Sequence, residues 1–109
     1  MDYTQTIKKL SIWFDNYTHS FKGGPQKLNE AVLLKYEHTK RVCCNMDSLC
    51  ESISLENPLL FVAQITALFH DVGRFQQYKD HGTFQDRKSV IHSQLGLKII
   101  DENHLFDDL

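Results

Sequence analysis

Apolar residues recur along the chain with the spacing of helices, and turn-forming residues divide them into segments. Aromatic and aliphatic side chains return every three or four positions over about residues 2–19, which is the period of one helix face. The run Gly23-Gly24-Pro25 ends that helix, and a second helix is predicted from about 29 to about 52. The residues of the second helix that we expect to face inward are Val32, Leu34, His38, Val42, Cys43, Met46, Leu49, Cys50 and Ile53.

The most apolar segment runs from Pro58 to Phe69, where only Gln64 and Thr66 are polar. A helix that is apolar on nearly every side has to be surrounded by protein, so we expect a central helix from 58 to about 71. This helix is shorter than the run of about 20 apolar residues that a membrane span requires.

The remaining segments complete an all-α pattern. Residues 73–87 have no clear period and are predicted to form a polar and aromatic loop. A last helix is expected from about 87 to about 103, with Asp86 as its cap. No stretch alternates in the manner of a β-strand. The predicted fold class is therefore all-α, with about four helices in a single domain over residues 1–109.

The composition is that of a soluble globular protein. Fourteen acidic and 12 basic residues give a net charge of −2, which argues against a surface built to bind nucleic acid. No signal peptide or membrane-spanning run is visible. Three cysteines, Cys43, Cys44 and Cys50, lie close together and are odd in number, so we expect free thiols in a reducing cytoplasm.

Two histidines from different helices are predicted to meet. His38 lies about 23 Å before the end of the second helix, and His70 lies about 18 Å beyond the start of the central helix. A short connection makes these helices antiparallel neighbours, so both histidines reach the same level of the bundle. Asp71 follows directly, and two imidazole nitrogens with one carboxylate oxygen suit a divalent metal ion.

The same three residues also have a simpler interpretation, in which two buried histidines and a carboxylate pack together without an ion. An aspartate at a helix C-terminus still needs positive charge beside it, because the helix dipole disfavours a negative charge there. Either a metal ion or Arg74 would supply that charge.

Three segments of the chain resemble a known family. The residues KYEHTKRV at 35–42, ALFHDVGRF at 67–75 and TFQDRKSVIHSQLG at 83–96 are similar to those of the HD-domain metal-dependent phosphohydrolases, and the likeness extends over about residues 28–100. The resemblance implies a helical HD-domain bundle that hydrolyses small phosphorylated substrates, nucleotides among them. It also implies a divalent ion as cofactor, which in this family is Mn, Fe, Co, Mg or Zn.

The resemblance assigns roles to five residues. The first histidine and the His-Asp doublet of the family bind the metal, and they correspond here to His38, His70 and Asp71. In members with two ions, the aspartate of the doublet bridges them. Arg74 matches a basic residue that faces the phosphate, and His92 matches a histidine that lines the site or binds a second ion. The catalytic residues implied are therefore Asp71, Arg74 and His92.

The chain departs from the family at one point. The family completes its coordination with an aspartate on a later helix, whereas no motif marks Asp101, Asp107 or Asp108 as that ligand. We therefore expect a truncated or split HD domain whose exposed helix faces are covered by a partner, for example a second copy of the chain. The alternative function is then a non-catalytic module that binds metal or nucleotide, or that completes its core with a partner.

The segment at 76–88 and the residue before it offer two groups of side chains with open roles. The basic ones, which either attract an anionic substrate or are simply solvated, are Lys79, His81, Arg87 and Lys88. The aromatic ones, which either stack on a nucleotide base or anchor the loop, are Phe75, Tyr78 and Phe84.

Overall fold

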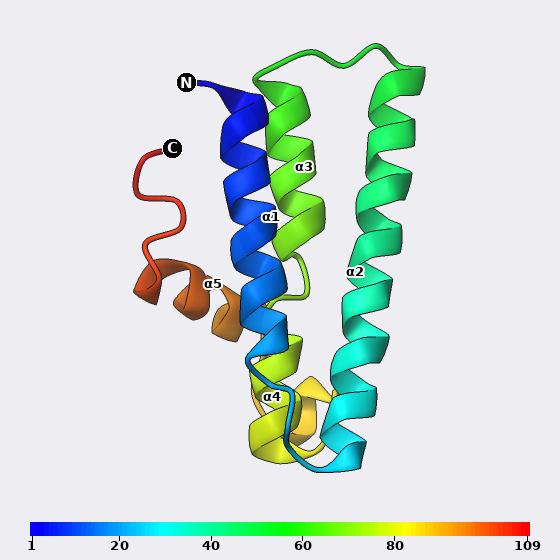
Figure 1. Ribbon diagram of the computed structural model, residues 1–109, viewed down its shortest axis with the longest axis vertical. Coiled ribbons are helices and arrows are strands. Elements are labelled where there is room, and N and C mark those ends of the chain that lie inside the picture. Colours follow the sequence, from blue (N-terminus) through cyan, green and yellow to red (C-terminus); the bar gives the residue numbers. More distant parts are fainter.

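The structure, a computed structural model, describes all 109 residues and is entirely helical (Figure 1). Its elements are the α-helices α1 (Tyr3–His19), α2 (Gln26–Ser52), α3 (Leu59–Phe69), α4 (Arg74–His81) and α5 (His92–Glu102), and the 3₁₀ helix η1 (Asp86–Lys88). The predicted all-α class is confirmed. No helix has both the length and the apolar character needed to cross a membrane.

The helix α3 occupies the central position that its sequence predicts, because it packs against both α1 and α2. Its antiparallel pairing with α2 is also as predicted, and Figure 1 shows α1, α2 and α3 running along the long axis. The N-terminal end of α3 is less enclosed than we expected, since Leu59 is 62% exposed and Val62 is 50% exposed. The helix also ends earlier, at Phe69, so that Asp71 lies in the turn that follows.

The prediction of a loop over residues 73–87 is wrong, because the first half of that segment forms α4. Its sequence is mostly polar, and only Phe75 and Gln77 are buried, so no apolar period marks it as a helix. Gly82 ends α4 in the left-handed conformation (φ 66°), which glycine adopts without steric cost. Asp86 does not cap the last helix, which begins only at His92; it begins the helix η1 instead.

The predicted inward face of α2 is only partly correct. Val32 and Cys50 are buried as expected, but Leu34, Leu49 and Ile53 are more than half exposed. The helix itself begins at Gln26, three residues earlier than predicted. Because α2 has its main contacts with α3 and α4, the apolar residues that point away from those two helices remain uncovered.

Aromatic side chains form much of the core around the turn between α3 and α4. Phe14 of α1 and Phe75 of α4 are fully enclosed and meet edge to face, with ring centroids 5.9 Å apart. Val72, which follows Asp71 in the sequence, has no exposed surface. The neighbours of Asp71 and Arg74 are therefore among the best-packed residues of the chain, and this packing holds the turn between α3 and α4 in place.

Two glycines allow α5 to pack against that turn with almost no space between their backbones. A Cβ atom on Gly73 would collide with the carbonyl oxygen of His92 and would lie 2.8 Å from the amide nitrogen of Gly96. A Cβ atom on Gly96 would have milder contacts, 3.3 Å from Val72 Cγ1 and 3.5 Å from the Gly73 nitrogen. The absence of a side chain at Gly73 thus brings the first turn of α5, and His92 with it, to the candidate site.

The substitution Gly73→Ala should therefore lower the free energy of unfolding by about 2–3 kcal/mol, because backbone atoms rather than flexible side chains have to move. Gly96→Ala is the matched control. Its looser contacts and the better helix propensity of alanine should keep the change below about 1 kcal/mol. Urea denaturation of both variants measures the difference, and equal losses would contradict this account of the helix contact.

Candidate metal centre

His38, His70 and Asp71, which we call the triad, converge at the junction of α2 with the end of α3. The Nε2 atoms of the two histidines are 3.4 Å apart, although the residues are 32 positions apart in the sequence. The Oδ2 atom of Asp71 lies 3.5 Å from each of these nitrogens. The structure thus brings together the three residues that the sequence predicts as metal ligands, in a nearly equilateral triangle of ligand atoms.

The orientation of His70 leaves the correct nitrogen free to bind a metal. Its Nδ1 atom lies 2.7 Å from the carbonyl oxygen of Ala67. A carbonyl oxygen can only accept, so Nδ1 carries the hydrogen and donates it, and Nε2 keeps its lone pair toward the triangle. Metal-binding histidines are commonly held by such a bond from the other ring nitrogen.

The dimensions of the triangle also fit an ion. A divalent transition metal with bonds of about 2.0–2.2 Å to nitrogen and oxygen separates neighbouring ligand atoms by about 3.0–3.5 Å. All three separations in the triad are 3.4–3.5 Å, and these residues form a group able to hold a metal ion. Asp71 is only 7% exposed, and a carboxylate that is so well buried requires a cationic partner.

The two carboxylate oxygens of Asp71 face different groups. Oδ2, which points toward the histidines of the triad, also lies 3.8 Å from Lys35 Nζ. Oδ1 lies 3.4 Å from His92 Nε2 and 3.7 Å from Arg74 Nε. Asp71 is therefore surrounded by nitrogen atoms from α2, from the turn after α3, and from the first residues of α4 and α5.

His92 is held in place by Asp86, whose Oδ2 atom lies 2.8 Å from His92 Nδ1. An ionised carboxylate only accepts hydrogen bonds, so Nδ1 carries the hydrogen, and Nε2 is the nitrogen that faces Asp71. The hydrogen bond with His92, supported by one from Gln77, lowers the pKa of Asp86 from 3.8 to about 2, and the charges of His92 and Arg74 act in the same direction. Sequence reasoning considered Asp86 as a helix cap and as a possible ion-pair partner of Arg74, and it missed the contact with His92.

Arg74 lies beside Asp71 as predicted, but most of its hydrogen bonding is directed at the segment after α4. Its Nη1 atom donates to Gln77 Oε1 (3.0 Å), to the carbonyl oxygen of Phe84 (2.6 Å) and to Asp86 Oδ1 (2.9 Å). Its Nε is buried without a hydrogen-bond acceptor. Arg74 therefore ties the 84–86 segment to the start of α4.

Gln77 is a supporting residue that sequence reasoning did not find. It is fully buried, and its Nε2 atom donates to Asp86 Oδ1, Ser89 Oγ and the carbonyl oxygen of Val90. No motif marks this glutamine, and a polar residue within a polar segment gives no sign that it is buried. Only its place on the inner face of α4 reveals its role.

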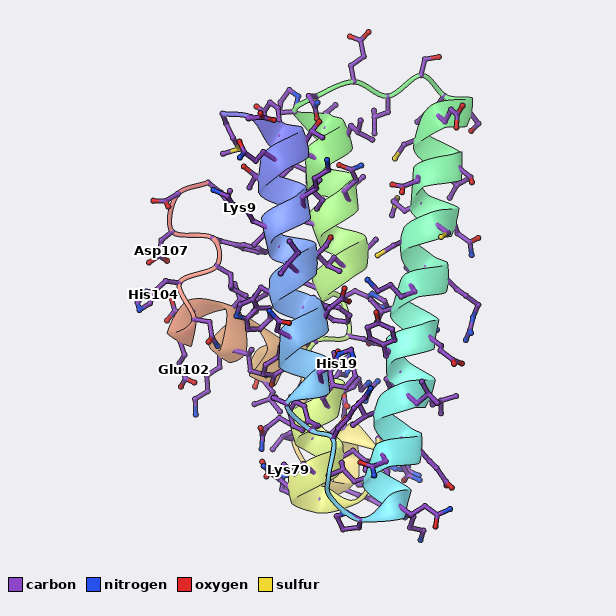
Figure 2. All side chains as sticks on the ribbon, viewed as in Figure 1. Lys9, His19, Lys79, Glu102, His104 and Asp107 are labelled. Atoms are coloured by element: carbon purple, nitrogen blue, oxygen red, sulfur yellow. The ribbon has the colours of Figure 1, made fainter.

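The other candidates contribute no ligand atom to the triad. Phe75 belongs to the core and cannot stack on a substrate, while Tyr78 and Phe84 pack on each other with centroids 4.8 Å apart. Asp107 pairs with His104, and both lie on the C-terminal segment, on the opposite side of α1 from α2 (Figure 2). Asp101 and Asp108 are exposed and do not join the triad.

One hollow of about 470 Å³ lies between the end of α1 and the start of α2. A second, of about 690 Å³, lies beside the α1–α2 loop. None of the residues that line these hollows belongs to the triad. The choice of site therefore depends on the donor atoms of the triad and not on cavity size.

Comparison with protein families agrees with this geometry. A family model described as the HD domain matches residues 36–109, which include the triad, Arg74 and His92. The match covers more than half of the chain, and the chain therefore belongs to the HD-domain family, a superfamily of metal-dependent phosphohydrolases. No curated protein and no solved structure gives a match.

The lowered pKa of Asp86 predicts a pH-dependent contribution to stability. A carboxylate whose pKa falls from 3.8 to about 2 on folding stabilises the folded state above about pH 4, and this contribution disappears as the pH falls through about 2. Asp86→Asn should therefore be less stable than the wild type at pH 6, and the difference should shrink between pH 4 and pH 2. Urea denaturation across this range measures the difference, and a difference that does not change with pH would contradict the assignment.

Proposed function

We propose that this chain is a metal-dependent phosphohydrolase that acts on a phosphomonoester or a nucleotide. His38, His70 and Asp71 are the proposed metal ligands. The observation that carries the proposal is the triangle of their ligand atoms, whose sides of 3.4–3.5 Å match the spacing around a transition-metal ion. Membership of the HD-domain family supports the reaction class.

A divalent ion held by the triad would polarise a phosphoryl oxygen and lower the pKa of a bound water toward 7, which supplies hydroxide near neutral pH. The protein's contribution is to fix the ligands. The Ala67 carbonyl orients His70, and the packing of Val72 and Phe75 holds the turn that carries Asp71. Such preorganisation means that the ligands need not rearrange when a substrate binds.

His92 is the proposed acid of the reaction. Asp86 accepts the hydrogen on Nδ1 and keeps the ring oriented, so that Nε2 is presented beside Asp71 Oδ1. A proton held on Nε2 can pass to the oxygen of the departing group, which would otherwise leave as a poorly stabilised alkoxide. Alternatively, the same nitrogen would contact the phosphate or help to hold a second divalent ion.

The proposed reaction predicts Mn²⁺-dependent hydrolysis of p-nitrophenyl phosphate or of one member of a nucleoside monophosphate panel. Asp71→Asn preserves the shape of the side chain but removes its charge. Loss of a group that is hydrogen-bonded to a metal ligand typically lowers activity roughly 10- to 100-fold. Asp71 is a proposed ligand itself, so the activity of Asp71→Asn should fall by more than this. The control His104→Ala removes an exposed histidine on the other side of the molecule and should remain fully active. Equal activity in Asp71→Asn and the wild type would contradict the proposal.

A second candidate function, a module that completes its core with a partner, is favoured by one observation. Leu33, Leu34 and Leu49 on α2 and Ile53 directly after it are all between 55% and 69% exposed. Isolated exposed apolar residues are ordinary, but several on one helix favour contact with other protein. We propose a second copy of the chain as the partner on this helix.

This second candidate predicts that the chain self-associates at micromolar concentration and that the substitutions Leu49→Gln and Ile53→Gln, made together, weaken the association. Both residues are exposed in the single chain, so the monomer fold should be unaffected. Sedimentation velocity measures the oligomeric state, and a hydrophobic dye reports uncovered apolar surface. A wild-type monomer that binds no dye would count against a partner-covered α2.

A further inference from the structure

Lys35 brings a positive charge close to the triad, although the family resemblance assigns no role to this residue. It lies three residues before His38 on α2, so both side chains are on the same side of the helix. Its Nζ atom is 3.8 Å from Asp71 Oδ2, the oxygen that also faces His38 and His70. The Lys35 side chain is 21% exposed, so it is largely enclosed but not sealed from solvent.

The ammonium group of Lys35 has no hydrogen-bond acceptor of its own. Asp71 is the single carboxylate within ion-pair distance, and 3.8 Å is too long for a hydrogen bond. The Phe84 ring lies against the group, with its centroid 4.9 Å from Nζ, and Phe84 in turn packs on Tyr78. The side chain is therefore oriented by an aromatic contact, while its three N–H donors remain available.

Arg74 differs in this respect. Its Nη1 atom is shared among Gln77, the Phe84 carbonyl and Asp86, and its Nε is buried. A guanidinium binds phosphate best through two parallel N–H donors. The edge formed by Nε and Nη2 is closed to a phosphate because Nε is buried. A phosphate at the edge formed by Nη1 and Nη2 would compete for the bonds that hold the 84–86 segment and, through Asp86, the ring of His92.

We infer that Lys35 is the residue that binds the phosphoryl oxygens of the substrate, and that Arg74 is a positioning residue that maintains the Asp86–His92 pair. This inference rests on the proposed function, because it names the cation that holds the phosphomonoester at the same site. The phosphate supplies the acceptors that the ammonium lacks, and hydrogen bonds between two charged groups are among the strongest in proteins. The contact with Phe84 limits the side-chain entropy that is lost when the ligand binds.

The inference is tested with phenylphosphonate, a phosphomonoester analogue that is not hydrolysed, titrated into the full Mn²⁺-loaded chain by calorimetry. Lys35→Met keeps an unbranched side chain over Phe84 but removes the charge, and Lys35→Arg restores the charge. Lys27→Met, on the exposed first turn of α2, is the control for loss of one positive charge. Mn²⁺ binding is measured separately for each variant.

Lys35→Met should weaken phenylphosphonate binding about 10- to 100-fold, which corresponds to the loss of one or two charged hydrogen bonds. Its affinity for Mn²⁺ should be unchanged or higher, because a competing positive charge has left Asp71. Lys35→Arg should recover most of the phenylphosphonate affinity, and Lys27→Met should bind like the wild type. Arg74→Met should unfold at a lower temperature and lose less phenylphosphonate affinity than Lys35→Met.

Three results would overturn the inference, and they can be told apart. If the wild type binds Mn²⁺ but Lys35→Met binds phenylphosphonate as well as the wild type does, Lys35 only neutralises Asp71, and the assignment is wrong while the metal site stands. If the wild type binds no Mn²⁺, the proposed function fails and the inference fails with it. A larger loss in Arg74→Met than in Lys35→Met would instead return the phosphate-binding role to Arg74.

Discussion

Asp71 carries its carboxylate beside the end of a helix, where the protein interior and the helix dipole both disfavour a negative charge. The structure compensates with nitrogen atoms from three further elements, namely Lys35 and His38 on α2, Arg74 on α4 and His92 on α5. Each of these elements therefore has to lie at a defined height relative to the turn after α3. A divalent ion at the triad would neutralise the carboxylate more completely than any of these side chains. The histidines that surround the buried carboxylate are thus also the residues that can bind a metal ion with it.

The arrangement around Asp71 depends on the close packing of α5 against the turn. Because Gly73 has no side chain, the first turn of α5 reaches the backbone of the turn and delivers His92 to the second oxygen of the carboxylate. Asp86 and Gln77 then hold His92 and the segment before it. The close contact between the two backbones thus explains why glycine occupies both positions, Gly73 in the HDVGR segment and Gly96 in the HSQLG segment.

The sequence was sufficient to predict the meeting of His38 with His70, because the part of α2 after His38 and the part of the chain from the start of α3 to His70 are similar in length and are joined by a short connection. It was not sufficient for α4, whose mostly polar residues hide a buried glutamine, nor for the contact between Asp86 and His92. The apolar residues of α2 were also misjudged at Leu34 and Leu49. Which face of a long helix is covered depends on its neighbours, and periodicity alone does not name them.

The most direct measurement for the central claim is the amount of Mn²⁺ bound per chain after equilibrium dialysis, compared between the wild type, His70→Ala and His104→Ala. His70 contributes one corner of the triangle of ligand atoms, whereas His104 is exposed and pairs only with Asp107. The account predicts at least one tightly held ion in the wild type and in His104→Ala, and its loss in His70→Ala. Retention of the ion in His70→Ala, or no binding in any of the three proteins, would contradict the account.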